Sequence, residues 1–398
     1  MKITCGLGVL NPDSVQASID LNLPGEGPSL KIPKSIAYAP LINSHDHLIG
    51  NWVPRAGDNR PYANSHIWVE DMKDSFAFQE RSRFWHNDGS FNLLEPNALN
   101  VARLGAYKNL FSGCGIVHDH APRQQDEYYN AMPIKVVKDF RQCHSITLGN
   151  WWGGGTPEEE LALSRGKEPF IIHLGEGIDD ITRGEFALLE ERNLLAPNTM
   201  MIHGIAFSRK EIERIAQVGA TVCWCPGSNY YLIGKTFDIM SALRLGANVV
   251  IGTDSTMSGE VNLIAEFAVI REHFPQISLR ELYRMVTLNA TKALNLKPEY
   301  ALLSPQNTRH LLLLDQVEGN PFENLLALEM NAIKLLMIDG VPLYGDSEYL
   351  DFLDESDAEY TIFRTGNREK FVIGDPLEIN DLIDAALGYH KDFPFLPF

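Results

Sequence analysis

Side chains that can bind a metal ion follow a series of short apolar runs in this sequence. His45 and His47 come after the first run, His173 and His203 end two later ones, and Asp254 closes the last. In a parallel α/β barrel the carboxyl ends of all strands meet on one face, so these five residues would converge there. Three imidazoles with a carboxylate suit Zn²⁺, Fe²⁺ or another divalent ion of similar softness. The pattern therefore predicts a metal centre.

The segment from residue 170 to residue 290 has the regular alternation that such a barrel requires. Apolar runs of strand length alternate with amphipathic stretches of helix length. The runs span residues 170–173, 199–203, 221–225 and 249–254. Helix starts are predicted from a hydroxyl followed three residues later by a glutamate, at Thr182 and Glu185, at Ser208 and Glu211, and at Ser278 and Glu281. This pattern predicts an α/β fold with a TIM-type (β/α)8 barrel.

The rest of the chain is less regular. Further strands are predicted at 36–42, 115–117 and 145–149, and the aromatic-rich stretch 52–110 is expected to be a long loop over the barrel mouth. Strand-like runs near both termini predict a small β-sandwich-like domain built from residues 1–35 and 305–398, including a C-terminal tail of unassigned role. The catalytic barrel is then residues 36–304.

Charge and composition narrow the class of protein. The 398 residues hold 34 Lys and Arg against 52 Asp and Glu, a formal net charge of −18. This balance argues against a nucleic-acid partner, whose phosphates require clustered basic side chains, and against an anionic membrane surface. No apolar run reaches bilayer length and no signal-peptide pattern is present, so a cytoplasmic location is expected. Five scattered cysteines predict reduced thiols.

Several segments together resemble the amidohydrolase superfamily, in particular its cytosine deaminase, guanine deaminase and triazine hydrolase branch. The resemblance covers about residues 35–345. The segments that carry it are Pro40 to Leu48 with its two histidines, His173 to Glu176, His203 with Gly204, Cys225 to Asn229, and Gly252 to Ser255.

The resemblance implies a set of site residues. His45, His47, His173 and Asp254 would bind one divalent ion, for which Zn²⁺ is favoured over Fe²⁺ and Mn²⁺. No lysine matches the bridging residue of the two-metal branches, so a single ion is expected. A family-level homodimer is also implied.

The same residue types suggest a reaction. The ion would lower the pKa of bound water, and Asp254 would orient or deprotonate that water. Glu176 would carry the proton to a ring nitrogen and then to the leaving group, and His203 would stabilise the developing oxyanion. The predicted function is hydrolytic deamination of an amino-substituted nitrogen heterocycle (a purine, pyrimidine, pterin, triazine or nucleoside) with release of ammonia.

Two other functions fit the same ligands less well. One is hydrolysis of a cyclic amide or displacement of a ring chloride or alkylthio group, and the other is a non-catalytic barrel that binds a metal ion or a small ligand.

Other candidate residues have weaker assignments. His118 and His120 form a second His-x-His pair without matching further ligands, and are expected to line the pocket or to be structural. Cys223 and Cys225 are expected to pack in the barrel. Ser228 with Asn229 could form a turn or contact the site, and the tryptophans at 52, 151 and 152 could stack on a planar substrate.

Overall fold

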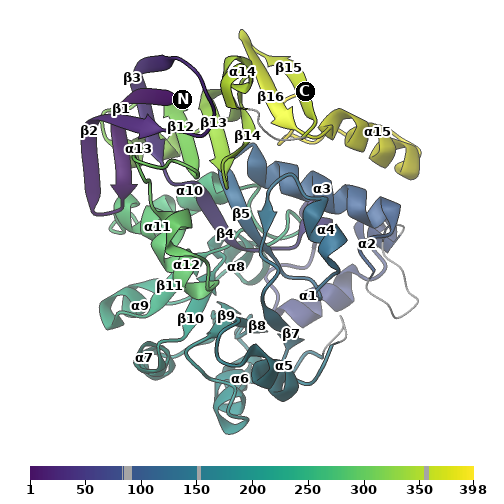
Figure 1. Cartoon of the computed structure of the whole chain (residues 1–398). Helices are drawn as coiled ribbons and strands as arrows, with labels where there is room; N and C mark the ends of the chain where they lie inside the picture. The colour runs from purple at the N-terminus through teal and green to yellow at the C-terminus, as the bar shows by residue number, and fades with distance from the viewer. Residues whose placement is uncertain (83, 85–91, 150–153, 354–357) are drawn as a thin grey trace.

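The computed structural model describes residues 1–82, 84, 92–149, 154–353 and 358–398. Two parallel sheets with surrounding helices make up its middle, and strands from both chain ends form a third sheet beside them (Figure 1). No helix of these described ranges combines the length and apolar character needed to cross a bilayer.

The larger parallel sheet contains the four apolar runs predicted between residues 170 and 254. Its strand order is β11-β10-β9-β8-β7, and every neighbouring pair is parallel. The strands are β7 (Arg141–Ser145), β8 (Phe170–Leu174), β9 (Thr199–His203), β10 (Thr221–Trp224) and β11 (Asn248–Ile251). The helices that alternate with them are α5 (Pro157–Ser164), α6 (Asp180–Glu191), α7 (Arg209–Val218), α8 (Pro226–Ile233) and α9 (Ile239–Leu245). The predicted alternation of strands and helices is confirmed.

The smaller parallel sheet has the order β4-β5-β6. Its strands are β4 (Leu41–Asp46), β5 (Cys114–Asp119) and β6 (Lys135–Val136). One edge of it meets the larger sheet, because the backbone N–H groups of Thr253 and Asp254 donate to the carbonyl of His45 at 3.0 and 3.1 Å. The end of β11 is thereby held against the end of β4.

The predicted start of helix α7 is confirmed, whereas the predicted start of helix α6 is not. Ser208 and Glu211 form the expected capping box of α7, and Gly219 ends that helix at φ 82°. Helix α6, in contrast, is capped by Asp179, whose carboxylate accepts from the N–H of Thr182, so the predicted start at Thr182 is wrong. Glu185 is therefore not a capping residue but a buried side chain on the inner face of the helix.

The stretch 52–110 contains helices where a loop was expected. They are α1 (Ser65–Met72), α2 (Phe76–Ser82) and α3 (Pro96–Leu110), while residues 83 and 85–91 lie outside the described ranges. Helix α3 starts at a proline after Glu95, whose carboxylate accepts from two first-turn N–H groups. It buries Val101, Ala102 and Leu104 completely, because it packs against the core.

Strands from both chain ends pair in one mixed sheet with the order β15-β16-β14-β13-β12-β3-β1-β2. The N-terminal strands are β1 (Lys2–Asn11), β2 (Ser14–Asn22) and β3 (Ser29–Tyr38). The others are β12 (Leu311–Asp315), β13 (Ile333–Ile338), β14 (Val341–Asp346), β15 (Tyr360–Thr365) and β16 (Arg368–Ile373). The antiparallel pairing of β3 with β12 joins the two ends of the chain.

Seven further α-helices of the described residues complete the fold. They are α4 (Asp126–Asn130), α10 (Leu263–His273), α11 (Leu279–Met285), α12 (Leu288–Ala293), α13 (Pro321–Leu326), α14 (Leu350–Leu353) and α15 (Pro376–Leu387). Helix α15 lies along α3 (Figure 1), where the hydroxyl of Tyr107 donates to the carbonyl of Ile373 at 2.8 Å. The chain after α15 returns to the segment that follows β4, since Lys391 donates to the carbonyl of Trp52.

Candidate metal centre

The structure brings all six sequence-predicted site residues into one cluster at the ends of the parallel strands. Three overlapping groups each place their potential ligand atoms within 4.8 Å of one another: His45 with His173 and His203, His45 with His47 and Asp254, and Glu176 with His203 and Asp254. These residues belong to β4, β8 and β9 and to the segments directly after β4, β8 and β11. Strand ends that are far apart in the sequence therefore position the cluster.

Three of the histidines are oriented by a hydrogen bond at Nδ1. The partners are the carbonyl of His120 for His47 at 3.1 Å, the carbonyl of His144 for His173 at 2.9 Å, and Oδ1 of Asn229 for His203 at 2.8 Å. Because each partner is an acceptor, Nδ1 carries the proton, and the lone pair of the neutral ring is on Nε2. Burial lowers the pKa of both His47 and His173, which favours this neutral ligand form.

His45 has a different environment. Both of its ring nitrogens are buried and have no hydrogen-bond partner among the described residues. Burial, reinforced by the neighbouring histidines, holds its pKa well below the usual range, so the ring is neutral. An unsatisfied buried polar atom costs about 1–3 kcal/mol, and coordination to a metal ion would remove that cost. The donor set of imidazoles and a carboxylate also fits a divalent ion such as Zn²⁺.

Asp254 is held as a charged carboxylate. Its Oδ1 lies 3.5 Å from Nε2 of His47 and accepts from the N–H of Ser255 at 2.7 Å. Its Oδ2 accepts from the hydroxyls of Ser228 and Ser258, both at 2.9 Å. Burial alone would raise the pKa of Asp254, but the adjacent histidines and these hydrogen bonds outweigh burial and lower it. Its backbone has φ 56°, a left-handed conformation that aspartate tolerates better than most residues.

Glu176 and His203 lie next to each other in the cluster. Oε1 of Glu176 lies 3.4 Å from Nε2 of His203, and burial raises the pKa of Glu176. His203 has φ 75°, a conformation that costs a non-glycine residue about 1–3 kcal/mol and is concentrated at functional sites. The backbone of Glu176 is held by Ser65, whose N–H donates to the carbonyl of Glu176 at 3.1 Å.

Glu185 supports the turn that carries Glu176. Its Oε2 accepts from the N–H of Gly175 at 2.6 Å, and its Oε1 accepts from the hydroxyl of Thr147. Burial raises the pKa of Glu185 to about 7. The sequence pattern had suggested a capping role for this glutamate, and its place behind the turn became visible only in the folded chain.

The second His-x-His pair, His118 and His120, lies against the cluster. The ring of His120 stacks on that of His173 with centroids 4.4 Å apart, and the centroids of His118 and His45 are 6.4 Å apart. His144 also contacts His173, with ring centroids 4.9 Å apart, although nothing in its local sequence distinguishes it. Seven histidines thus lie together, of which the sequence motifs had assigned four to the site.

Of the remaining candidate residues, some contact the site and others pack in the protein interior. Ser228 and Asn229 both contact site residues, as the hydrogen bonds to Asp254 and His203 show. Cys223 and Cys225 are buried, as expected for packing. Trp52 is buried against Phe84, with ring centroids 4.6 Å apart, and the tryptophans at 151 and 152 lie outside the described residues.

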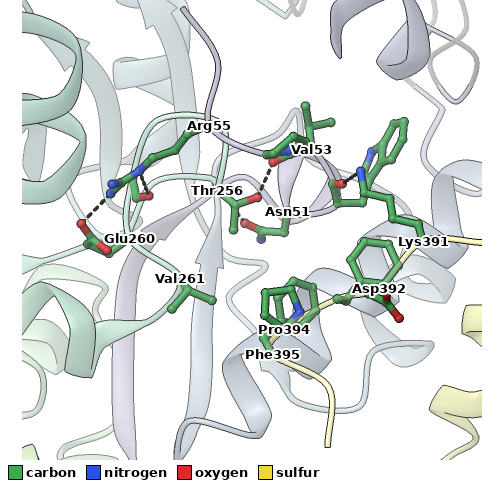
Figure 2. Close-up of a pocket in the computed structure, with 14 residues that line it drawn as sticks. Asn51, Val53, Arg55, Thr256, Glu260, Val261, Lys391, Asp392, Pro394 and Phe395 are labelled. Atoms are coloured by element: carbon green, nitrogen blue, oxygen red, sulfur yellow. Dashed lines mark hydrogen bonds and ion pairs between the residues drawn. The ribbon is translucent and has the colours of Figure 1, made fainter. Parts of the chain in front are cut away.

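A pocket of about 290 Å³ lies beside the segments that follow β4 and β11 (Figure 2). Asn51 to Arg55 line it on one side, Thr256 and Gly259 to Val261 on another, and Lys391 to Phe395 of the C-terminal tail on the third. The hydroxyl of Thr256 donates to the carbonyl of Val53 at 2.7 Å across the first two of these segments. The tail therefore forms one wall of a pocket next to the segment that carries Asp254.

Part of this chain matches a known protein family. Residues 161–343 match the model of the amidohydrolase family. Together with the relatives described next, this match supports the resemblance to the amidohydrolase superfamily seen in the motifs. The relatives found include proteins named as deaminases, and the similar solved structures include a triazine hydrolase.

One relative is the 5-methylthioadenosine/S-adenosylhomocysteine deaminase of Pyrococcus horikoshii, which is 30% identical over 209 residues, 46% of this chain and 48% of that protein. The chain thus spans less than half the length of this curated relative.

Two solved structures share the fold. An adenosine deaminase from Xanthomonas campestris with bound zinc has a TM-score of 0.68 at 14% identity, covering 86% of this chain and 92% of the other. The atrazine chlorohydrolase TrzN from Arthrobacter aurescens TC1, complexed with zinc, has a TM-score of 0.66 at 18% identity, covering 86% and 94%.

Proposed function

We propose that this protein is a metal-dependent hydrolase that deaminates an amino-substituted nitrogen heterocycle with release of ammonia. The observation that carries the proposal is the close approach of Glu176 and His203 to Asp254 within the histidine cluster. A metal site alone could be structural, but a buried acid–base pair beside it provides the proton transfers that hydrolysis of a C–N bond requires.

His45, His47, His173 and Asp254 would hold one divalent ion, for which Zn²⁺ is the first candidate and Fe²⁺ or Mn²⁺ the alternatives. The ion, when bound, supplies Lewis acidity that brings the pKa of a water ligand towards neutrality. The neutral state of His45, His47 and His173 supports this assignment, because a protonated imidazole cannot bind a cation.

Asp254 and Glu176 divide the proton transfers between them. Asp254, whose pKa is lowered, is charged and can accept a proton from the attacking water. Glu176, whose pKa is raised, can hold a proton of its own and donate it to a ring nitrogen of the substrate, while the water proton on Asp254 goes to the amino group that leaves as ammonia.

His203 completes the acid–base set. Its Nδ1–H is engaged by Asn229, so its Nε2 can donate to a developing oxyanion only when the ring is protonated. Oε1 of Glu176 lies 3.4 Å from this Nε2. We therefore assign the neutral ring of His203 to hold the proton of Glu176 in place until the ring nitrogen of the substrate takes it.

The substrate class we propose is the adenine nucleosides and their sulfur-containing derivatives. The relatives named for adenosine, 5-methylthioadenosine and S-adenosylhomocysteine support this choice. The similarity to an atrazine chlorohydrolase keeps displacement of a ring chloride as the second candidate, since the same ligands would serve it.

Ammonia release from zinc-loaded protein tests the choice between these reactions. The substrates are adenosine, 5′-methylthioadenosine, S-adenosylhomocysteine, guanine, cytosine, a pterin and an amino-substituted chlorotriazine. We expect ammonia from the adenine compounds, accompanied by the absorbance change of conversion to the hypoxanthine ring. Release of chloride from the triazine, with no ammonia from any substrate, would contradict deamination and favour the second candidate.

We also propose that the eight strands of the two parallel sheets form a (β/α)8 barrel, comprising residues 36–304, with the chain ends as a separate β domain. The backbone hydrogen bonds between His45 and the end of β11 support closure on one side. The homodimer and the cytoplasmic location stay predictions.

A further inference from the structure

Lys108, on helix α3, is a buried cation that the proposed reaction does not use. Its side chain and that of Asp46 are both fully inaccessible, and their charged atoms lie 3.0 Å apart. Lysine is almost never fully buried unless it is paired. Nζ of Lys108 also donates to Oδ1 of Asn51 at 2.9 Å.

Asp46 is the last residue of strand β4 and lies in the sequence directly between the predicted ligands His45 and His47. Side chains alternate along a strand, so Asp46 points away from the face on which His45 and His47 meet Asp254. Both of its oxygens are held, since Oδ1 accepts from Asn51 at 2.9 Å and Oδ2 from Asn109 at 2.8 Å. The ion pair therefore fixes the backbone from which both histidines project.

The same cluster extends to the segment that carries Asp254. Oδ1 of Asn51 accepts from the N–H of Thr256 at 3.1 Å, next to the pocket of Figure 2. Asn43 accepts from the N–H of Thr253 at 3.2 Å and donates to its hydroxyl at 2.8 Å. The residues on both sides of Asp254 are thus tied to the residues around His45 and His47.

Helix α3 packs closely against the segment after β4, which allows Lys108 to reach Asp46 and Asn51. A Cβ at Gly105 would lie 2.3 Å from the carbonyl oxygen of Leu48, so only glycine allows α3 to approach the segment after β4 this closely. Lys108 and Asn109 follow one turn later on the same helix and enter the cluster from there. Lys108 thus belongs to the part of the sequence that separates the parallel strands β4 and β5.

We propose that Lys108 is a positioning residue for the metal centre, which holds the two ligand-bearing segments, 45–47 and 253–256, in register through Asp46 and Asn51. The inference rests on the metal site of the proposed function. It assigns part of the affinity for the ion to side chains that never touch it, because ligands held in place before binding lose less conformational freedom when the ion arrives. Groups that orient metal ligands are typically worth about 10- to 100-fold in metal affinity.

The test compares metal affinity in two variants that each break a buried lysine–aspartate pair. Lys108→Met removes the cation at similar side-chain length. The matched control is Lys370→Met, because Lys370 on β16 is also fully buried and pairs with Asp346 at 2.6 Å, but in the sheet made by the chain ends. Zn²⁺ affinity is measured by competition with a chromophoric chelator, and the visible absorption of the Co²⁺-loaded protein reports ligand geometry.

We expect Lys108→Met to raise the dissociation constant for Zn²⁺ by about 10- to 100-fold and to change the Co²⁺ spectrum. Lys370→Met should lower thermal stability while leaving both metal readouts unchanged. If Lys108→Met does not fold, Asn51→Ala serves in its place, because it removes the link to Thr256 and leaves the ion pair intact.

Two different failures can be told apart. Wild-type protein that binds no divalent ion would refute the proposed function itself. Wild-type protein that binds one ion, with Lys108→Met or Asn51→Ala binding it equally tightly and with the same spectrum, would overturn only the positioning role of Lys108.

Discussion

Glu176→Gln is expected to lower kcat for deamination by about 100- to 10,000-fold, the usual contribution of a positioned general acid–base group. Glutamine keeps the shape of the side chain but cannot accept or deliver a proton. Since Glu176 is not among the proposed metal ligands, metal content should stay the same as in wild type. Single-turnover kinetics and elemental analysis on the same preparation measure both quantities.

The control for this variant is Glu190→Gln on helix α6, where the glutamate forms a surface ion pair with Arg214 at 2.8 Å. It changes the same residue type on the next helix and should keep wild-type turnover. A Glu176→Gln protein that retains most of its activity would show that the proton is carried elsewhere.

Asp254→Asn is expected to have the second largest effect, because it removes a proposed ligand charge and the proposed acceptor of the water proton at once. We expect Zn²⁺ affinity to fall by more than about tenfold and turnover at saturating Zn²⁺ to fall by at least about 100-fold. Metal titration followed by assay at saturation separates the two losses.

Asp238→Asn provides the comparison for Asp254→Asn. Asp238 caps helix α9 through the N–H of Ser241, and asparagine caps about equally well. This variant should match wild type in both measurements. Full turnover of Asp254→Asn at saturating Zn²⁺ would contradict the role of Asp254 as proton acceptor and leave it, at most, as a ligand.

Much of the α/β fold could be predicted because local patterns determine it. The run that ends at His173 and the run that ends at His203 are mostly apolar, without the polar alternation of a half-exposed strand, and both are strands in the structure. The boundary at Pro40 was harder, because residues 36–42 are continuously apolar. The chain leaves β3 at Tyr38 and begins β4 at Leu41, so one predicted strand is two.

Other features depend on contacts that no local pattern encodes. Asp179 and Thr182 are both good caps for α6, and only the folded chain shows which of them is used. The pairing of Lys108 with Asp46 joins residues 62 positions apart, and the orientation of His173 depends on a backbone carbonyl of another strand. Convergence of the six site residues was expected from strand ends, whereas their hydrogen-bonded surroundings became visible only in three dimensions.

The central claim is that one ion held by the histidine cluster drives deamination, and a metal titration of the apo protein tests it most directly. Protein stripped with a chelator is reloaded stepwise with Zn²⁺, and ammonia release from 5′-methylthioadenosine is measured at each step. We predict no release from the apo protein and a linear rise that ends at about one ion per chain, as a single site of four ligands requires. Undiminished ammonia release from metal-free protein, or none at any loading from any adenine nucleoside, would contradict the claim.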